Sequence, residues 1–155
     1  MPEGVGLGFD VHARDASRPL WLGALLFEAE PGLAGHSDGD VVCHAIADAL
    51  LGAGALGDVG EHFPETDAAN EGISGAAILG TSAELIARRG LSLLSFDVTV
   101  VCDRPAIAPR RDEMRARLAE ITGLSADRVS VKGTRPEGLG LTGEGIGCLA
   151  VALLR

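Results

Sequence analysis

Hydrophobic and polar positions follow two different spacings along the chain, and together they predict alternating strands and helices. Apolar residues at positions 41, 42, 45, 46, 49 and 50 repeat at helical spacing, and either Asp38 or Asp40 can cap the start of this helix. Runs rich in β-branched and other apolar residues predict strands. We therefore expect strands at about 5–12, 19–27, 91–101, 129–132 and 147–154, and helices at about 40–51, 74–89 and 109–122.

This order of elements predicts an α+β fold, a mixed β-sheet with helices layered on one face. The first two strand regions are neighbours in sequence, so we expect them to pair as a hairpin. The stretch 56–72, rich in Gly, Asp, Glu and Pro, is long enough for a functional loop. A length of 155 residues fits a single domain over residues 1–155.

Composition argues against several classes of partner. The formal net charge is −9, there is no tyrosine and there is one tryptophan, so we expect no nucleic-acid partner. No apolar run approaches the roughly 20 residues that span a bilayer, and the N-terminus lacks the pattern of a signal peptide; we expect a cytoplasmic protein without membrane contact. The three cysteines are widely spaced and should pack as small hydrophobic residues.

The first part of the chain contains a candidate metal site. Asp10 and His12 are two residues apart in an expected strand, so their side chains point to the same side. His44 lies one turn into the expected helix and can supply a third ligand. Three protein ligands of this kind leave one coordination position open, as in catalytic zinc sites. In an acidic protein, such an ion could also supply the positive charge that a phosphate ligand needs.

The segment 138–147 has glycine at several alternate positions before the last expected strand. Glycines in this pattern allow backbones to approach closely, which suits packing around a subunit axis. A flexible loop before a buried strand explains the same spacing equally well.

Several motifs occur in order over nearly the whole chain and resemble those of one enzyme family. They are Gly8-Phe9-Asp10-Val11-His12, His36-Ser37-Asp38-Gly39-Asp40-Val41, Ala47-Asp48-Ala49-Leu50-Leu51-Gly52, Ala55-Leu56-Gly57-Asp58-Val59-Gly60, Phe63-Pro64-Glu65-Thr66-Asp67 and Glu137-Gly138-Leu139-Gly140-Leu141-Thr142-Gly143. Together they are similar to the motifs of the 2-C-methyl-D-erythritol 2,4-cyclodiphosphate synthase family.

The resemblance implies a lyase of non-mevalonate isoprenoid biosynthesis. Its substrate would be 4-diphosphocytidyl-2-C-methyl-D-erythritol 2-phosphate, a small nucleotide diphosphate, and its products the cyclic diphosphate and CMP. The family forms homotrimers with active sites at the subunit interfaces. By resemblance, Asp10, His12 and His44 would bind Zn²⁺, and Glu137 would help to hold Mg²⁺ or Mn²⁺. Without the resemblance, Glu137 would be read as a solvated loop carboxylate.

The resemblance also assigns catalytic and substrate-binding residues. His36 would stabilise the transition state; without the resemblance it could equally be a histidine in a surface loop. Arg135 would also be catalytic, because it occupies the position of a catalytic threonine. Asp48 could orient an imidazole or simply be an exposed helix charge. We expect His62 at the surface. The substrate would be bound by Ser37, Asp58, Gly60, Phe63, Asp67, Cys102, Ala108, Thr134 and Leu141.

The chain departs from the family pattern at five positions. Ala106 replaces a common lysine and Ala108 a larger apolar residue, which puts side-chain contacts to the nucleotide in doubt. Arg135 replaces a threonine but could pair with a phosphate bidentately. Glu144 replaces a common arginine, and Ile146 a common glutamate. Three Glu144 side chains near a threefold axis would repel an anion, so we expect no isoprenoid diphosphate to bind there; tight binding of farnesyl diphosphate in calorimetry would contradict this.

Two other functions remain open from the sequence. A metal-dependent phosphoesterase or nucleotide pyrophosphatase would use a metal-bound water as the nucleophile. A non-catalytic trimeric metal-binding protein would bind ligand without turnover.

Overall fold

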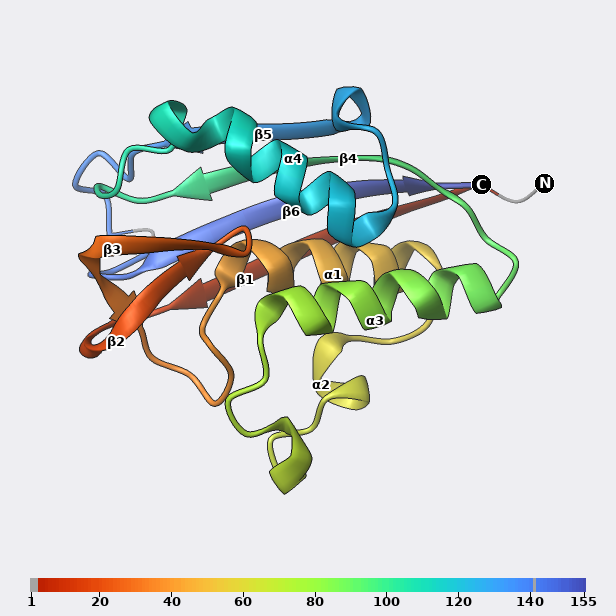
Figure 1. Cartoon of the computed structure of the whole chain (residues 1–155), viewed down its shortest axis with the longest axis horizontal. Coiled ribbons are helices and arrows are strands. Elements are labelled where there is room, and N and C mark those ends of the chain that lie inside the picture. Colours follow the sequence, from red (N-terminus) through yellow and green to blue (C-terminus); the bar gives the residue numbers. More distant parts are fainter. Residues whose placement is uncertain (1–2, 141) are drawn as a thin grey trace.

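The computed structural model describes residues 3–140 and 142–155, and its centre is a four-stranded mixed sheet (Figure 1). The strand order is β1-β6-β4-β5, with β1 at Gly4–His12, β6 at Ile146–Leu154, β4 at Leu93–Val101 and β5 at Val129–Thr134. Strands β4 and β5 pair in parallel, whereas β6 is antiparallel to both of its neighbours. The C-terminal ends of β1, β4 and β5 therefore lie at the same end of the sheet.

The predicted hairpin between the first two strand regions is wrong. Strand β1 pairs along its whole length with β6, and a separate two-stranded sheet forms from β2 (Arg14–Leu22) and β3 (Leu25–Leu33). One residue, Ala13, separates β1 from β2, which is too few for a hairpin turn. Gly23 and Ala24 instead make the turn between β2 and β3, and both have the positive φ, 60° and 59°, that a two-residue turn of this kind needs.

The longer helices lie over one face of the sheet, as predicted (Figure 1). They are α1 (Val41–Ala53), α3 (Gly75–Arg88) and α4 (Arg111–Thr122). Asp40 caps α1 by accepting hydrogen bonds from the amides of Val42 and Cys43 at 3.1 Å each, and Ser74 caps α3. The loop after α1 contains the short helix α2 (Val59–His62); 3₁₀ turns cover Ala68–Asn70, Ala108–Arg110 and Ala126–Arg128.

Strand β1 touches α1 through glycines at alternate positions. A Cβ atom at Gly4, Gly6 or Gly8 would lie only 2.2, 1.8 or 1.8 Å from a carbonyl oxygen of α1, those of Ala53, Ala49 and Ala45 respectively. No side chain fits in that space, so these glycines let the helix lie directly on the strand. Asp10 and His12 continue the same face of the strand toward its C-terminal end.

The opposite face of the sheet is apolar and exposed. Its large side chains come from β1 and β6: Val5, Leu7, Phe9, Val11, Leu149 and Val151. A contiguous apolar surface on a folded chain commonly marks a protein interface.

The cysteines pack as predicted. Cys43, Cys102 and Cys148 are buried and form no disulfide bond. Burial raises the pKa of all three thiols, that of Cys102 to about 11. A thiol in such surroundings is a poor nucleophile.

Candidate metal and phosphate site

The three predicted metal ligands come together at the end of β1. Oδ2 of Asp10 lies 3.1 Å from Nε2 of His12 and 3.0 Å from Nδ1 of His44, and the possible ligand atoms all lie within 4.8 Å of one another. Asp10 and His12 come from β1, and His44 comes from the first turn of α1. The glycines between these two elements bring the helix close enough for the three side chains to meet.

Each imidazole is fixed from outside the group by a hydrogen bond. Nδ1 of His12 donates to the carbonyl of Ala34, which leaves Nε2 to face Asp10. Nε2 of His44 lies 3.2 Å from Oγ of Ser37, which leaves Nδ1 to face the same carboxylate. The inner nitrogen of each ring therefore faces the Asp10 carboxylate, and a cation can lie among the three side chains. Such outer hydrogen bonds are typical of histidines that bind metal, so these residues fit a divalent ion.

Local electrostatics also favour positive charge at this point. Burial raises the pKa of Asp10, but the hydrogen bonds and charges of His12 and His44 outweigh burial and lower it to about 2. The hydrogen bond to Asp10 is the main cause that raises the pKa of His12. The carboxylate thus stays ionised and attracts either protons on the imidazoles or a metal ion.

A cleft of about 260 Å³ opens beside the ligands. Four other predicted site residues line it: His36, Ser37, Gly60 and Phe63. Glu65, which belongs to the predicted substrate loop 63–67, lines it too. Asn70, Ile73 and Ile78 also line it but were not predicted, since no spacing in the sequence marks them. Ser37 also has a contact that the sequence did not predict: its hydroxyl lies 3.2 Å from Nε2 of His44 and can fix the orientation of this candidate ligand.

Three predicted residues of this region have other contacts. The carboxylates of Asp58 and Asp67 accept hydrogen bonds from the amides of Glu61 and Ala69, each at 2.9 Å, and so begin α2 and a 3₁₀ turn. Their contact with substrate stays a prediction. Asp48 matches neither expectation: it accepts a hydrogen bond from the Val59 amide at 2.8 Å and ties α2 to α1. His62 is exposed, as predicted.

A second pocket of about 160 Å³ lies where the parallel strands β4 and β5 end. The predicted residues Cys102, Ala108, Thr134 and Arg135 line it, and so does Arg111, which the sequence did not single out. Strands β1 and β5 are the two edges of the sheet, so this pocket and the metal ligands lie at the same end but on opposite edges.

The remaining two predicted site residues are Glu137 and Leu141. Glu137 is exposed in the loop after β5, and it is not part of the Asp/His/His group found among the described residues. Its binding of a second ion stays a prediction. Leu141 lies outside the described residues.

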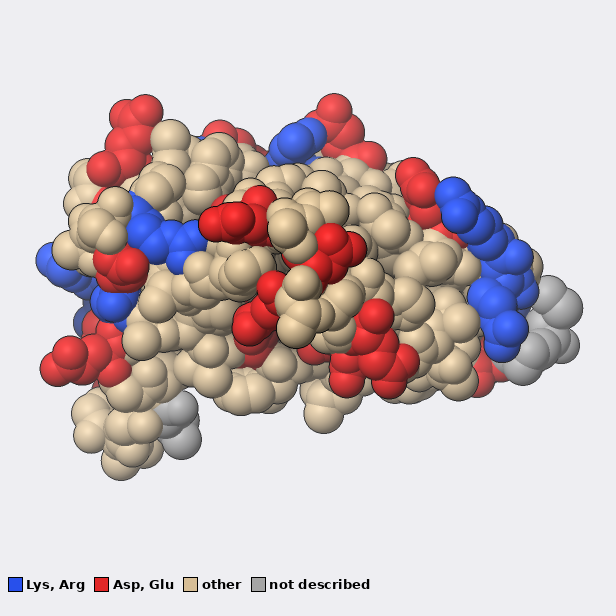
Figure 2. Space-filling view, turned by 90° about the horizontal axis from the view of Figure 1, so that it is seen from below, with Lys and Arg blue, Asp and Glu red and all other residues tan. Residues whose placement is uncertain are grey.

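Charge on the surface is unevenly placed. Figure 2 shows acidic side chains across the middle of the face seen from below, whereas Lys and Arg gather toward its ends. A phosphate ligand would therefore depend on local cations in this chain. No helix in the described ranges, 3–140 and 142–155, is both long and apolar enough to cross a membrane.

Known proteins of one family match this chain over nearly its whole length. The model of the YgbB family matches residues 4–155. The chain is 47% identical over 152 residues to a 2-C-methyl-D-erythritol 2,4-cyclodiphosphate synthase of Erwinia tasmaniensis, covering 97% of both chains. It is also 47% identical over 152 residues to the bifunctional enzyme IspD/IspF of Erythrobacter litoralis, and it spans 39% of that relative's length.

Solved structures show the same fold. A 2C-methyl-D-erythritol-2,4-cyclodiphosphate synthase bound to CDP matches with a TM-score of 0.90 at 36% identity, over 97% of this chain and 99% of the other. The bifunctional IspDF of Campylobacter jejuni matches with a TM-score of 0.93 at 34% identity, over 99% of this chain and 42% of the other.

Proposed function

Because this chain belongs to the YgbB family, we propose that it is a lyase of isoprenoid biosynthesis that converts 4-diphosphocytidyl-2-C-methyl-D-erythritol 2-phosphate to 2-C-methyl-D-erythritol 2,4-cyclodiphosphate and CMP. The observation that carries this proposal is the group of Asp10, His12 and His44, in which both imidazoles are oriented toward one carboxylate. These three side chains would hold Zn²⁺, which supplies Lewis acidity toward a phosphate oxygen when bound.

The reaction needs positioning more than covalent help. An oxygen of the 2-phosphate forms a bond to the β-phosphorus while the bond from that phosphorus to the CMP oxygen breaks, and CMP leaves with the electron pair. The attack is intramolecular, so the enzyme must fold the substrate back and neutralise its phosphates. His36 and Ser37 line the cleft beside the metal ligands, and Arg135 can pair with a phosphate bidentately.

We propose that the active sites form between the subunits of a homotrimer. Three strand spacings, about 14 Å, separate the β1 edge with the metal ligands from the β5 edge with the second pocket. A neighbouring copy that packs on the exposed apolar face could bring its β5 edge to the β1 edge of the first. Glu137 follows β5, so it would enter the site with the nucleotide and hold Mg²⁺ or Mn²⁺ against the phosphates.

Product analysis tests the proposed reaction. The protein is incubated with the diphosphocytidyl substrate, with zinc and magnesium, and followed by phosphorus NMR with and without a chelator. A cyclic diphosphate plus CMP, lost on chelation and restored by metal, is the expected result. A linear hydrolysed phosphate would indicate a phosphoesterase, and metal-dependent binding without turnover would indicate a binding protein.

A further inference from the structure

Two arginines that line the pocket at the end of β5 have no ion-pair or hydrogen-bond partner among the described residues. The side chains of Arg111 and Arg135 form no ion pair and no hydrogen bond in the described ranges 3–140 and 142–155. In α4, the residues one turn beyond Arg111 are Met114 and Arg115, neither of which is acidic. The two acidic residues that follow Arg111, Asp112 and Glu113, already pair with Arg115 at 3.2 Å and with Arg110 at 2.8 Å.

Both arginines line the same 160 Å³ pocket between the ends of β4 and β5. The acidic side chain in that lining is Asp103, so arginine charge predominates there, in a protein whose net charge is −9. Two guanidinium groups that line one pocket can both donate hydrogen bonds to an anion bound there.

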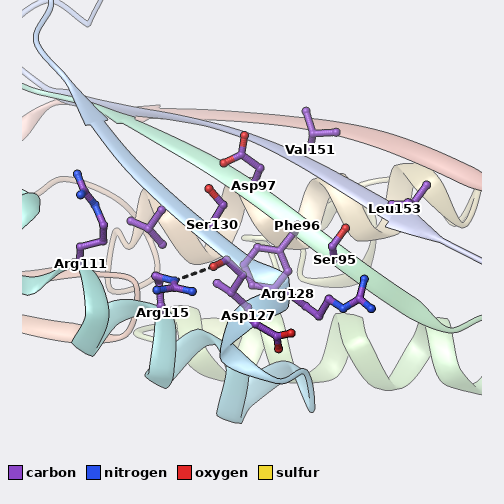
Figure 3. A pocket seen from close by; sticks show the side chains of 12 residues that line it. Ser95, Phe96, Asp97, Arg111, Arg115, Asp127, Arg128, Ser130, Val151 and Leu153 are labelled. Carbon is purple, nitrogen blue, oxygen red and sulfur yellow. Dashed lines mark hydrogen bonds between the residues drawn. The ribbon is translucent and has the colours of Figure 1, made fainter.

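The neighbouring arginines differ in whether their side chains already form hydrogen bonds within the protein. A groove of about 560 Å³ runs along β5 beside the pocket, and Arg111, Arg115 and Arg128 all line it (Figure 3). Arg115 turns back to the strand and donates to the carbonyl of Val129 at 2.8 Å, so it fastens α4 to β5. The Arg111 side chain extends from the first residue of α4 away from that bond, and it lines both the groove and the pocket.

We propose that Arg111 is a substrate-binding residue, whose guanidinium binds a phosphate of the cytidine nucleotide together with Arg135. A guanidinium presents a planar fork of donors that matches phosphate oxygens, and it stays charged at any pH of interest. The identity of the nucleotide rests on the proposed function.

The test compares Arg111→Ala and Arg111→Lys with a matched control, Arg128→Ala. Arg128 lines the groove but not the pocket, is exposed, and its removal deletes the same single charge. Calorimetry measures CDP affinity and steady-state assays measure kcat and KM. We expect Arg111→Ala to weaken CDP binding roughly ten- to a hundredfold, and Arg111→Lys to weaken it less. KM should rise by a similar factor while kcat stays nearly unchanged, and Arg128→Ala should stay within about twofold of the parent protein.

Equal CDP affinity of Arg111→Ala and the parent protein would contradict the proposal. An equal loss of CDP affinity in Arg128→Ala would also contradict it, because the loss would then come from the change in net charge rather than from a contact made by Arg111. Thermal melting of each variant shows whether it is folded. The proposed function is tested by a different result: it is wrong if the parent protein makes no cyclic diphosphate. CDP calorimetry of the Arg111 variants still tests nucleotide binding in that case.

Discussion

Replacing Gly8 with alanine tests how the metal site is built. The new Cβ would lie 1.8 Å from the carbonyl oxygen of Ala45, 2.8 Å from its carbonyl carbon and 2.9 Å from the amide nitrogen of Ala49. All three atoms belong to the backbone of α1, so no side-chain rotation relieves the clash. An ordinary contact begins at 3.4 Å, and 3.4 − 1.8 leaves about 1.6 Å by which strand and helix must separate.

This separation acts on stability and on metal binding. Overpacking of this kind costs about 1–3 kcal/mol of folding free energy. The metal site is more sensitive, because Asp10 lies on β1 and His44 on α1, with 3.0 Å between their facing atoms. Metal–ligand distances tolerate only about 0.2 Å. We therefore expect Gly8→Ala to weaken zinc binding by roughly a hundredfold or more, at least as much as loss of an outer hydrogen bond does.

Two control variants separate local geometry from general damage. Gly4→Ala creates a similar clash, 2.2 Å from the Ala53 carbonyl oxygen, but it lies six residues before Asp10, about 20 Å along the strand. It should lose stability and keep most of its zinc affinity. Gly52→Ala, in the same helix as His44, meets nothing within 4 Å and should not destabilise the protein. Urea unfolding measures stability, and competition with a chromogenic chelator measures zinc affinity.

A zinc affinity of Gly8→Ala within about threefold of that of the parent protein, together with a lower free energy of unfolding, would contradict this prediction. Equal losses of zinc affinity in Gly4→Ala and Gly8→Ala would also contradict it, because the strand–helix distance near the ligands would then have no special role.

Three further variants test other contacts. Ser37→Ala removes the hydrogen bond that orients His44 and should weaken zinc binding about 10–100-fold in chelator competition; unchanged affinity would show that Ser37 does not orient the ligand. Burial raises the pKa of Asp48, so its contribution to stability is full below the ordinary pKa of 3.8 and is lost as the pH rises through the folded-state pKa. Asp48→Asn, whose amide oxygen can still accept from the Val59 amide, should therefore be more stable than the parent protein at neutral pH but not below pH 3.8; urea unfolding with equal differences at both pH values would refute this. Arg135→Ala should lower turnover more than it weakens metal binding, and unchanged steady-state kinetics would contradict that.

The sequence predicted best those features that depend on local spacing. The alternation of β1 places Asp10 and His12 on one side, and the cap at Asp40 fixes where His44 falls in α1. Both follow from chain geometry over a few residues. Glycine at every second position, Gly4, Gly6 and Gly8, is a pattern that also indicates close contact between this strand and a helix, but it was not part of the prediction.

Features that depend on distant pairing were missed. Strand β1 pairs with β6, from Gly4 opposite Leu154 to His12 opposite Ile146, and nothing near β1 in the sequence indicates that partner. The proposed role of Arg111 also depends on distant contacts, because only the fold brings it into one pocket lining with Arg135.

Strand β1 performs two unrelated tasks with interleaved residues. Odd positions, from Val5 to Val11, carry the bulky side chains of the bare sheet face, while even positions carry the glycines and then the ligands. A substitution scan along this strand should therefore alternate. Odd positions should change how the unfolding midpoint depends on protein concentration, whereas even positions should change stability and, close to Asp10 and His12, metal affinity. Few substitutions in this strand should be neutral, since adjacent residues take part in different contacts and every position is constrained by one of them.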